Sequence, residues 1–264
     1  MTRKIAVNQI TTPQWSLLDA IKHYAQTDGI QGIGIWADKL AAINTSKAAQ
    51  LLQDKGLQVS TLVIVANFTR DVKQGIETGK QAIENAYQLG CKTILTVVGP
   101  RMHLSVEKGN ALTREALEVL SPIAQQADVT LALEPLHPMD ITRFSTIITI
   151  PQTLTVIKDL PNIGLIFDTW NTWWEPDLSN QLQYAKDSIA CVQLADWQET
   201  SDNPHNRTVP GNGVIHLQDL MQQVKQLGYQ GWYEVEIMSD QYQPEQYPEL
   251  LEKCVRGAEY ALSV

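Results

Sequence analysis

Short apolar runs alternate with longer stretches of mixed polarity along the whole chain. Runs rich in Val, Ile and Leu that are bounded by turn residues are typical of strands buried on both faces. The predicted strands are Ile5–Ile10, Gly32–Trp36, Val59–Val65, Thr93–Val98, Thr130–Glu134, Ile163–Phe167, Ile189–Leu194 and Trp232–Ile237. The stretches between them carry apolar residues at helical spacing, so strand and helix alternate as a repeating unit.

Each predicted strand is followed by a predicted helix. The helices cover Leu17–Ala25, a segment ending near Lys55, a segment ending near Leu89, Ser105–Ala127, Pro151–Leu160, Leu178–Lys186, Leu217–Leu227 and Pro244–Ala261. Gly56, Gly90 and Gly228 stand just past helix ends, where a left-handed C-cap favours glycine. This pattern in 264 residues predicts an α/β fold, the (β/α)8 TIM barrel, as a single domain over residues 1–264. The competing doubly wound sheet would need a glycine-rich dinucleotide turn after its first strand, and the sequence has none there.

Composition and net charge limit the possible binding partners and the expected cellular location. The net charge is −9 and no basic stripe occurs, which argues against a nucleic acid or an anionic membrane as a partner. Cys91, Cys191 and Cys254 are too widely spaced for a disulfide framework or a zinc site. The N-terminal apolar run is too short for a signal peptide and no long apolar stretch follows, so we expect a cytoplasmic protein.

Acidic and amide residues stand at or near the ends of the last four predicted strands. Glu134 ends the fifth strand, Asp168 follows the sixth, Gln193 lies near the end of the seventh and Glu236 near the end of the eighth. In a (β/α)8 barrel these positions converge at one end of the barrel axis, where active sites lie. One such residue alone could be a satisfied core carboxylate or a helix cap. Several of them on successive strands predict a metal site, because a buried charge is costly unless it is paired or metal-bound.

The chain from its fifth to its eighth strand resembles the xylose isomerase-like TIM-barrel family of sugar isomerases and epimerases. Its members include tagatose and inosose epimerases and hydroxypyruvate isomerases. The resemblance covers residues 130–240, and the order of strands and helices is similar over the whole chain. In that family a Glu, an Asp, a His and a Glu on strands five to eight bind one divalent metal. The resemblance implies that Glu134, Asp168 and Glu236 fill three of these roles.

A loop motif adds to the resemblance. The family's Arg-x-x-Pro-Gly-x-Gly loop after strand seven appears here as Arg207, Pro210, Gly211 and Gly213. By resemblance, Arg207 would hold a hydroxyl or carboxylate of the substrate.

At two positions the chain departs from the family pattern. Gln193 replaces the histidine on strand seven, and Asn171 replaces the histidine three residues after the Asp. A Gln carbonyl oxygen can still coordinate a metal, so Gln193 is the expected fourth ligand. An all-oxygen site favours Mn²⁺ or Mg²⁺ over Co²⁺ or Zn²⁺. Loss of the metal remains the alternative.

The resemblance also implies a mechanism. A sugar ketone and its neighbouring hydroxyl would chelate the metal, which stabilises the enediolate formed when the α-proton leaves. Glu134 and Glu236 would be the catalytic acid and base as well as metal ligands, while Asp168 and Gln193 would be ligands only. Return of the proton to the other face epimerises the sugar, and return to the neighbouring carbon isomerises it.

Further residues near the predicted barrel mouth are candidates for substrate binding. They are His137 and His103, which can donate or accept hydrogen bonds, Asn171 as a neutral donor, and the aromatic side chains of Trp36, Trp170 and Trp197. Aromatic faces are good platforms for the apolar side of a sugar ring. His137 could instead be a loop histidine bound to backbone, and the tryptophans could instead pack long loops or an oligomer interface.

Other classes of function stay open to different degrees. A dehydratase of a ketonic cyclitol or of dehydroshikimate would use the same metal and the same first proton abstraction. A metal-free barrel that binds a sugar without catalysis would explain the two replaced histidines, although three unneutralised acids would repel one another. A DNA endonuclease on this fold would need a histidine-rich site and a positive surface, which this chain lacks. Barrels of this family often pair, so a homo-oligomer is open as well.

Overall fold

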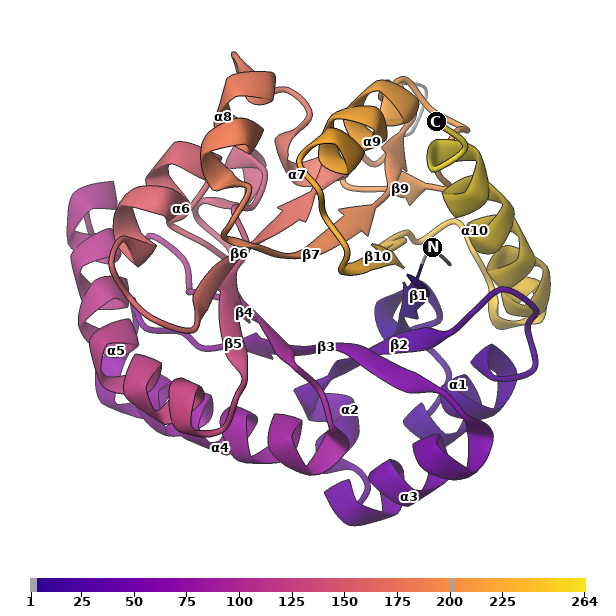
Figure 1. Ribbon diagram of the computed structural model, residues 1–264, viewed down its shortest axis with the longest axis horizontal. Helices are drawn as coiled ribbons and strands as arrows, with labels where there is room; N and C mark the ends of the chain where they lie inside the picture. The colour runs from indigo at the N-terminus through magenta and orange to yellow at the C-terminus, as the bar shows by residue number, and fades with distance from the viewer. Residues whose placement is uncertain (1–3, 200–201) are drawn as a thin grey trace.

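The chain folds into a closed barrel of parallel strands. In the computed structural model, which describes residues 4–199 and 202–264, the barrel strands are β1 (Lys4–Asn8), β2 (Gly32–Trp36), β3 (Gln58–Val65), β4 (Thr93–Val97), β5 (Thr130–Leu133), β6 (Ile163–Asp168), β7 (Ile189–Leu194) and β10 (Trp232–Val235). Neighbouring strands follow chain order, and β10 pairs with β1 to close the barrel (Figure 1). The predicted (β/α)8 TIM barrel is confirmed.

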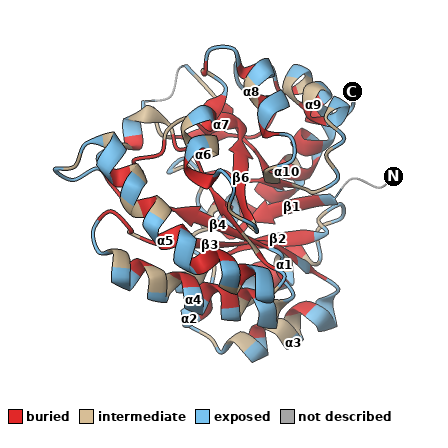
Figure 2. Cartoon of the chain, turned by 60° about the vertical axis from the view of Figure 1, so that its left-hand side comes forward, coloured by how far each residue is buried: buried red, intermediate tan, exposed pale blue. Residues whose placement is uncertain are grey.

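Helices surround the barrel. They are α1 (Leu17–Tyr24), α2 (Ala37–Ala41), α3 (Thr45–Lys55), α4 (Val72–Leu89), α5 (Val106–Gln126), α6 (Ile150–Ile157), α7 (Thr169–Thr172), α8 (Leu178–Ala185), α9 (Leu217–Gln226) and α10 (Tyr247–Ala261), with short 3-10 turns at Gln9–Thr11, Pro138–Asp140 and Pro244–Gln246. Figure 2 shows their buried faces turned to the strands and their exposed faces outward. The hydroxyls of Ser16 and Ser105 cap α1 and α5. Gly56 and Gly90 end α3 and α4 in the left-handed conformation, as predicted.

Apolar side chains form two clusters, one between the strands and the helices and one inside the barrel. The inner cluster consists of Val63, Leu95, Val97, Leu136, Ala132, Ile166 and Cys191. Side chains alternate between the two faces of a strand, so residues two positions apart face the same side. Glu134, Asp168 and Gln193 stand two positions beyond inner-cluster members, and they therefore face the barrel interior.

A small hairpin lies between β7 and β10, where the sequence predicts only a long loop. Its strands are β8 (Asp196–Trp197) and β9 (Arg207–Thr208), which pair antiparallel. The Asp196 carboxylate accepts backbone N–H groups from Gly211 and Gly213 at 3.0 Å each. The Pro-Gly-x-Gly segment thus wraps around Asp196 and fixes the hairpin that carries Arg207.

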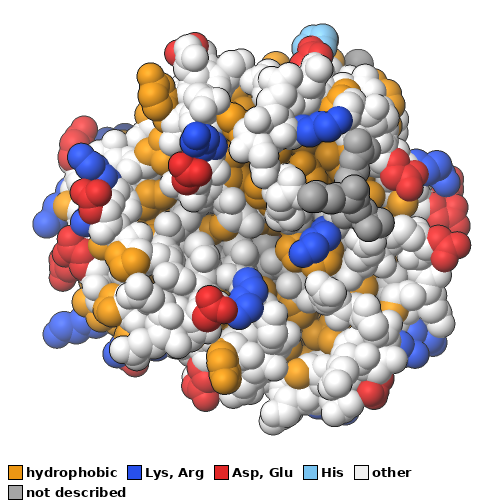
Figure 3. All heavy atoms as spheres, in the orientation of Figure 1, with side chains coloured by type: hydrophobic (Ala, Val, Ile, Leu, Met, Phe, Trp, Pro, Cys, Tyr) orange, Lys and Arg blue, Asp and Glu red, His pale blue; other side chains and the backbone are white. Residues whose placement is uncertain are grey.

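The surface carries mixed charge. On the face drawn in Figure 3, basic and acidic side chains are interspersed around the rim. None of the helices within residues 4–199 and 202–264 has the length and apolar character needed to cross a membrane.

Candidate metal and substrate site

A cavity of about 290 Å³ opens at the carboxyl ends of the barrel strands. Its inner wall combines acids and amides with apolar side chains from β3 and β4, and its outer wall comes from loops. The lining residues are Trp36, Val63, Val65, Val97, Glu134, Leu136, Asp140, Arg143, Phe144, Trp170, Asn171, Asn203, His205, Asn206, Arg207, Glu236, Met238, Ser239 and Asp240. This is the end of the barrel at which the strand-end residues were expected to meet.

Three carboxylates converge at the base of this cavity. Glu134 follows β5, Asp168 ends β6 and Glu236 follows β10, and one oxygen of each lies within 4.8 Å of the others. All three side chains are buried. Asp168 is fixed because its Oδ1 caps α7, where it accepts the backbone N–H groups of Trp170 at 2.7 Å and Asn171 at 3.2 Å. The geometry is that of a group able to hold a divalent cation.

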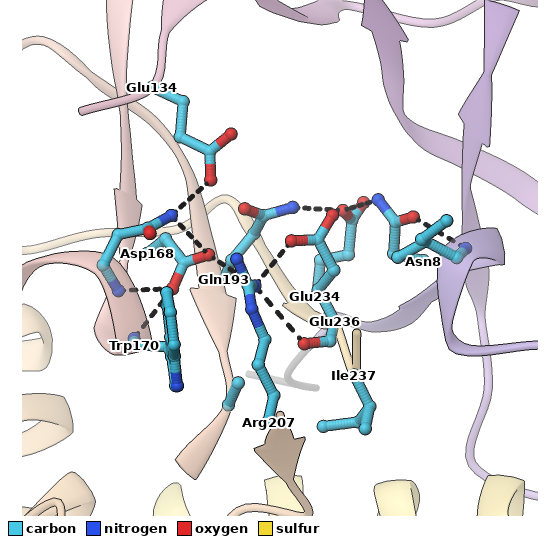
Figure 4. Close-up of polar contacts among 12 residues, drawn as sticks. Asn8, Glu134, Asp168, Trp170, Gln193, Arg207, Glu234, Glu236 and Ile237 are labelled. Atoms are coloured by element: carbon cyan, nitrogen blue, oxygen red, sulfur yellow. Dashed lines mark hydrogen bonds and ion pairs between the residues drawn. The ribbon is translucent and has the colours of Figure 1, made fainter. Parts of the chain in front are cut away.

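Arg207 reaches into the carboxylate group from β9. Its Nη1 donates to Asp168 Oδ2 at 2.8 Å and to Glu236 Oε2 at 2.6 Å (Figure 4). The guanidinium carbon also lies 5.0 Å from the centre of the Trp170 ring, within cation–π range. The sequence predicts Arg207 as a substrate-binding residue, and the structure shows it lining the cavity while ion-paired to two of the acids.

Asn171 links two of the acids. Its Nδ2 donates to Glu134 Oε1 at 2.8 Å and to Asp168 Oδ2 at 3.2 Å, and its Oδ1 accepts the backbone N–H of His137 at 2.9 Å. The sequence predicts Asn171 as a donor to substrate. Asn171 lines the cavity, and its Nδ2 group faces the carboxylates because the backbone N–H of His137 fixes the direction of the carboxamide.

Burial and like charge shift the proton affinities of the group. Burial raises the pKa of Glu134 well above its usual value, and the charges of Glu236 and Asp168 raise it further. Burial also raises the pKa of Glu236 to about 7, although the Arg207 guanidinium opposes this shift. Burial lowers the pKa of Arg207, but the three acids outweigh it and raise that pKa above its usual value. When ionised, the three acids outnumber the one guanidinium, and the raised pKa values mean that the buried group binds protons to reduce this excess of negative charge. A divalent cation would offset the same excess.

Gln193 on β7 is the register partner of Asp168 on β6. Its Nε2 donates to Glu234 at 2.9 Å, while its buried Oε1 has no hydrogen-bond partner among the described residues. Buried acceptors are rarely left unpaired. An orphaned amide oxygen beside three carboxylates fits a hard divalent cation, for which oxygen ligands are preferred.

The remaining predicted substrate-binding residues fall into two groups. Trp36 and Trp170 line the cavity. His137, His103 and Trp197 are not part of its lining. His137 packs against Trp170 instead, and Trp197 stacks on Trp173.

His103 points to solvent because of a local turn. The Nε of Arg101 donates to the carbonyl of Leu104, so the segment after β4 turns back on itself and leaves His103 exposed. A role of His103 in substrate binding stays a prediction.

Two sets of residues in or near the site are not predicted from the ends of the strands. Glu234 lies inside β10, and its only signal is an acid on the same strand face as Glu236. Asp140, in the 3-10 turn Pro138–Asp140, and Arg143 and His205, on loops, line the outer wall of the cavity. Their positions depend on the conformation of the segments between strands and helices, which the hydrophobic periodicity of the sequence does not predict.

The sequence and the fold have counterparts among known proteins. A family model described as "Xylose isomerase-like TIM barrel" matches residues 23–256. The inosose isomerase of Bacillus licheniformis is 28% identical over 275 residues, which cover 97% of this chain and 95% of that protein. The 3-dehydro-D-guloside 4-epimerase of Escherichia coli K12 is 23% identical over 255 residues, covering 88% of this chain and 92% of that protein.

A solved structure shows the same fold. The crystal structure of the IOLI protein with a bound zinc atom has a TM-score of 0.84 and 22% identity to this chain, and the match covers 98% of both chains. Since the family model also spans most of the sequence, this protein belongs to the xylose isomerase-like TIM-barrel family.

Proposed function

We propose that the protein isomerises or epimerises a small sugar or keto-polyol at a divalent cation held by Glu134, Asp168, Gln193 and Glu236. The observation that carries this proposal is the convergence of three buried carboxylates at the base of the cavity, with the unpaired amide oxygen of Gln193 on the strand next to Asp168. Relatives named inosose isomerase and 3-dehydro-D-guloside 4-epimerase point to keto-polyols as the substrate class.

The donor set indicates the kind of cation. Oxygen ligands alone favour Mn²⁺ or Mg²⁺ over Zn²⁺, which prefers nitrogen and sulfur. When bound, the cation would act as a Lewis acid on the substrate carbonyl and on the negative charge left by proton removal.

Two of the acids are placed to exchange a proton with the substrate. Glu134 and Glu236 follow β5 and β10, which β6 and β7 separate, so they approach the cavity from different sides. Asn171 contacts one oxygen of Glu134 and Arg207 contacts one oxygen of Glu236. The second oxygen of each could remove or return the proton next to the carbonyl. Asp168, which binds α7 and Arg207 through both oxygens, would serve as a ligand only.

The cavity suits a single sugar ring or cyclitol. Its volume of about 290 Å³ is at the lower end for small-molecule sites. Trp36 and Trp170 offer apolar surface for the ring, and Arg207 offers N–H donors for a hydroxyl. Polar side chains at the outer wall, which include Asp140 and His205, would meet the hydroxyls farthest from the carboxylates.

Solvent-deuterium incorporation tests this proposal. The Mn²⁺-loaded protein is incubated in D₂O with inososes, ketohexoses and hydroxypyruvate, and exchange of the carbon-bound proton is followed by NMR. We expect exchange in one substrate class, and a rate at least about 100-fold lower in Glu236→Gln, because that variant lacks one proton-transferring carboxylate. The matched control is Glu175→Gln, a buried acid outside the cavity, which should keep the wild-type rate.

Other outcomes would identify other functions. Loss of water with a new conjugated carbonyl absorbance would indicate a dehydratase. Sugar binding without exchange or Mn²⁺ binding would contradict the proposal and indicate a metal-free binding barrel.

A further inference from the structure

A buried carboxylate outside the proposed ligand set faces the carboxamide of Gln193. Glu234 on β10 and Gln193 on β7 are register partners in the barrel, and both side chains are fully buried. Glu234 is not part of the cavity lining. The proposed function assigns it neither a ligand role nor a proton-transfer role.

Glu234 receives hydrogen bonds from three other strands. Its Oε1 accepts from Asn8 Nδ2 at 2.8 Å and from Gln193 Nε2 at 2.9 Å. Its Oε2 accepts from the hydroxyls of Ser60 and Thr61 on β3. In each of these contacts the carboxylate is the acceptor.

The direction of these hydrogen bonds is fixed at the Asn8 end. Asn8 Oδ1 accepts from the indole N–H of Trp36 at 2.9 Å and from the backbone N–H of Ile10 at 3.1 Å. Neither group can act as an acceptor, so the Nδ2 of Asn8 must face Glu234. Gln193 meets the same carboxylate oxygen and must present its own NH₂ group. A reversed Gln193 carboxamide would place two acceptor oxygens against each other.

The oxygen of Gln193 is consequently turned away from Glu234. Figure 4 shows its nitrogen directed at Glu234 and its oxygen on the side where Glu134 and Asp168 lie. The three carboxylates of the cluster are themselves strong acceptors and would attract the NH₂ group of Gln193. Glu234 is the acceptor that competes with them for it.

We propose that Glu234 is a positioning residue, which holds the carbonyl oxygen rather than the NH₂ group of Gln193 toward Glu134, Asp168 and Glu236. This inference rests on the proposed function, because it concerns the fourth oxygen ligand of the same cation. It explains how an amide can replace the strand-seven histidine: a carboxylate behind the amide fixes which of its two ends serves as the ligand.

Two substitutions of Glu234 separate orientation from charge. Glu234→Gln keeps an acceptor oxygen for Gln193, since the hydroxyls of Ser60 and Thr61 can rotate to accept from the new NH₂ group. Glu234→Met removes the acceptor, and the NH₂ group of Gln193 can then turn to the carboxylates. We expect Mn²⁺ affinity, measured by calorimetry and Mn²⁺ electron paramagnetic resonance on the metal-stripped chain, to stay within about threefold in Glu234→Gln and to fall at least about tenfold in Glu234→Met. Equal losses in both variants would assign the effect to charge and overturn the inference.

A double variant, in which position 193 is changed as well, provides a rescue experiment. A carboxylate at position 193 presents an oxygen on either side, so its orientation does not matter. Gln193→Glu combined with Glu234→Met should bind Mn²⁺ at least as tightly as the wild type. A double variant as weak as Glu234→Met alone would contradict the positioning role. The control Glu175→Met, in which another buried acid is removed, should leave the affinity unchanged.

If Glu234→Met does not fold, a measurement on the wild type tests whether the oxygen of Gln193 binds the cation. On titration with Mg²⁺, the ¹³Cδ resonance of Gln193, assigned by its loss in Gln193→Met, should shift with one equivalent while its NH₂ protons stay slow to exchange. An unmoved ¹³Cδ resonance in a protein that binds Mg²⁺ would overturn the inference and leave the proposed function standing. Absence of Mn²⁺ and Mg²⁺ binding by the wild type would instead overturn the metal-dependent function itself.

Discussion

Arg207 compensates buried negative charge at the base of the cavity. Its side chain is 5% exposed and pairs with Asp168 and Glu236, which are buried as well. Removing one partner from a buried ion pair costs about 3–5 kcal/mol, because the remaining charge is left uncompensated in a low-dielectric site. A divalent cation would supply compensating charge at the same place.

We therefore predict that Arg207→Met lowers the free energy of unfolding by about 3–5 kcal/mol in chelator, and by less when Mn²⁺ is present. Urea unfolding with and without Mn²⁺ measures both values. The control is Arg256→Met, whose 3.5 Å pair with Glu252 is solvent-exposed and should change stability by less than about 0.5 kcal/mol. A loss that Mn²⁺ does not reduce would contradict a shared role of the guanidinium and the cation.

The two amides show what the sequence can predict about single residues. Gln193 and Asn171 are recognisable as replacements of histidines, and a carboxamide retains an oxygen for a metal. Their hydrogen bonds are not predictable, because the direction of each carboxamide depends on groups from distant segments. For Asn171 that group is the backbone N–H of His137, and for Gln193 it is the carboxylate of Glu234.

Among the elements, the barrel strands follow most directly from the sequence. A strand buried on both faces leaves a continuous apolar run, and the structure confirms Gly32–Trp36 and Ile189–Leu194 as predicted. The β8–β9 hairpin is different, because each of its strands has only two residues. It depends on backbone N–H groups that converge on Asp196, an arrangement that no local pattern shows.

Glu175, which lies between α7 and α8 and contacts the start of α6, gives a prediction about pH. Its carboxylate accepts the backbone N–H of Ile150, and burial raises its pKa from 4.5 to about 7 although this hydrogen bond opposes the shift. The folded protein thus holds this proton more tightly than the unfolded chain. Its contribution to stability is full below the unfolded pKa and is lost as pH rises through the folded pKa.

Relative to Glu175→Gln, the wild type should therefore lose stability between about pH 5 and pH 8. Denaturant unfolding of both proteins across this range gives the difference. A difference that does not change with pH would show that Glu175 does not titrate in this window.

In the whole molecule, the cavity joins segments from both halves of the chain. The acids come from residues 134–236, whereas Trp36, Val63 and Val97 come from the first four strands. The closed barrel and the convergence of the acids follow from strand order. The outer wall does not, since Arg143 and His205 lie on loops that meet only in the folded protein.

A cation that binds only the folded protein should stabilise the whole barrel. At a Mn²⁺ concentration of about 100 times the dissociation constant, the free energy of unfolding should rise by about 2.7 kcal/mol. For a chain of this size that corresponds to a rise of roughly 5–10 °C in Tm. Differential scanning calorimetry with Mn²⁺ and with chelator measures this shift. It should be absent in Glu236→Gln, and a shift of equal size there would place the cation elsewhere.

The contact between Asn8 and Glu234 spans 226 positions of the sequence and crosses the seam at which β1 meets β10. During synthesis, Asn8 leaves the ribosome long before its partner exists, and the entropy of closing so long a loop is lost only when the last strand docks. A nascent chain that ends before β10 lacks both Glu234 and Glu236. We therefore expect the barrel to mature in one late step, in which the seam closes and the amide of Gln193 acquires its orientation together.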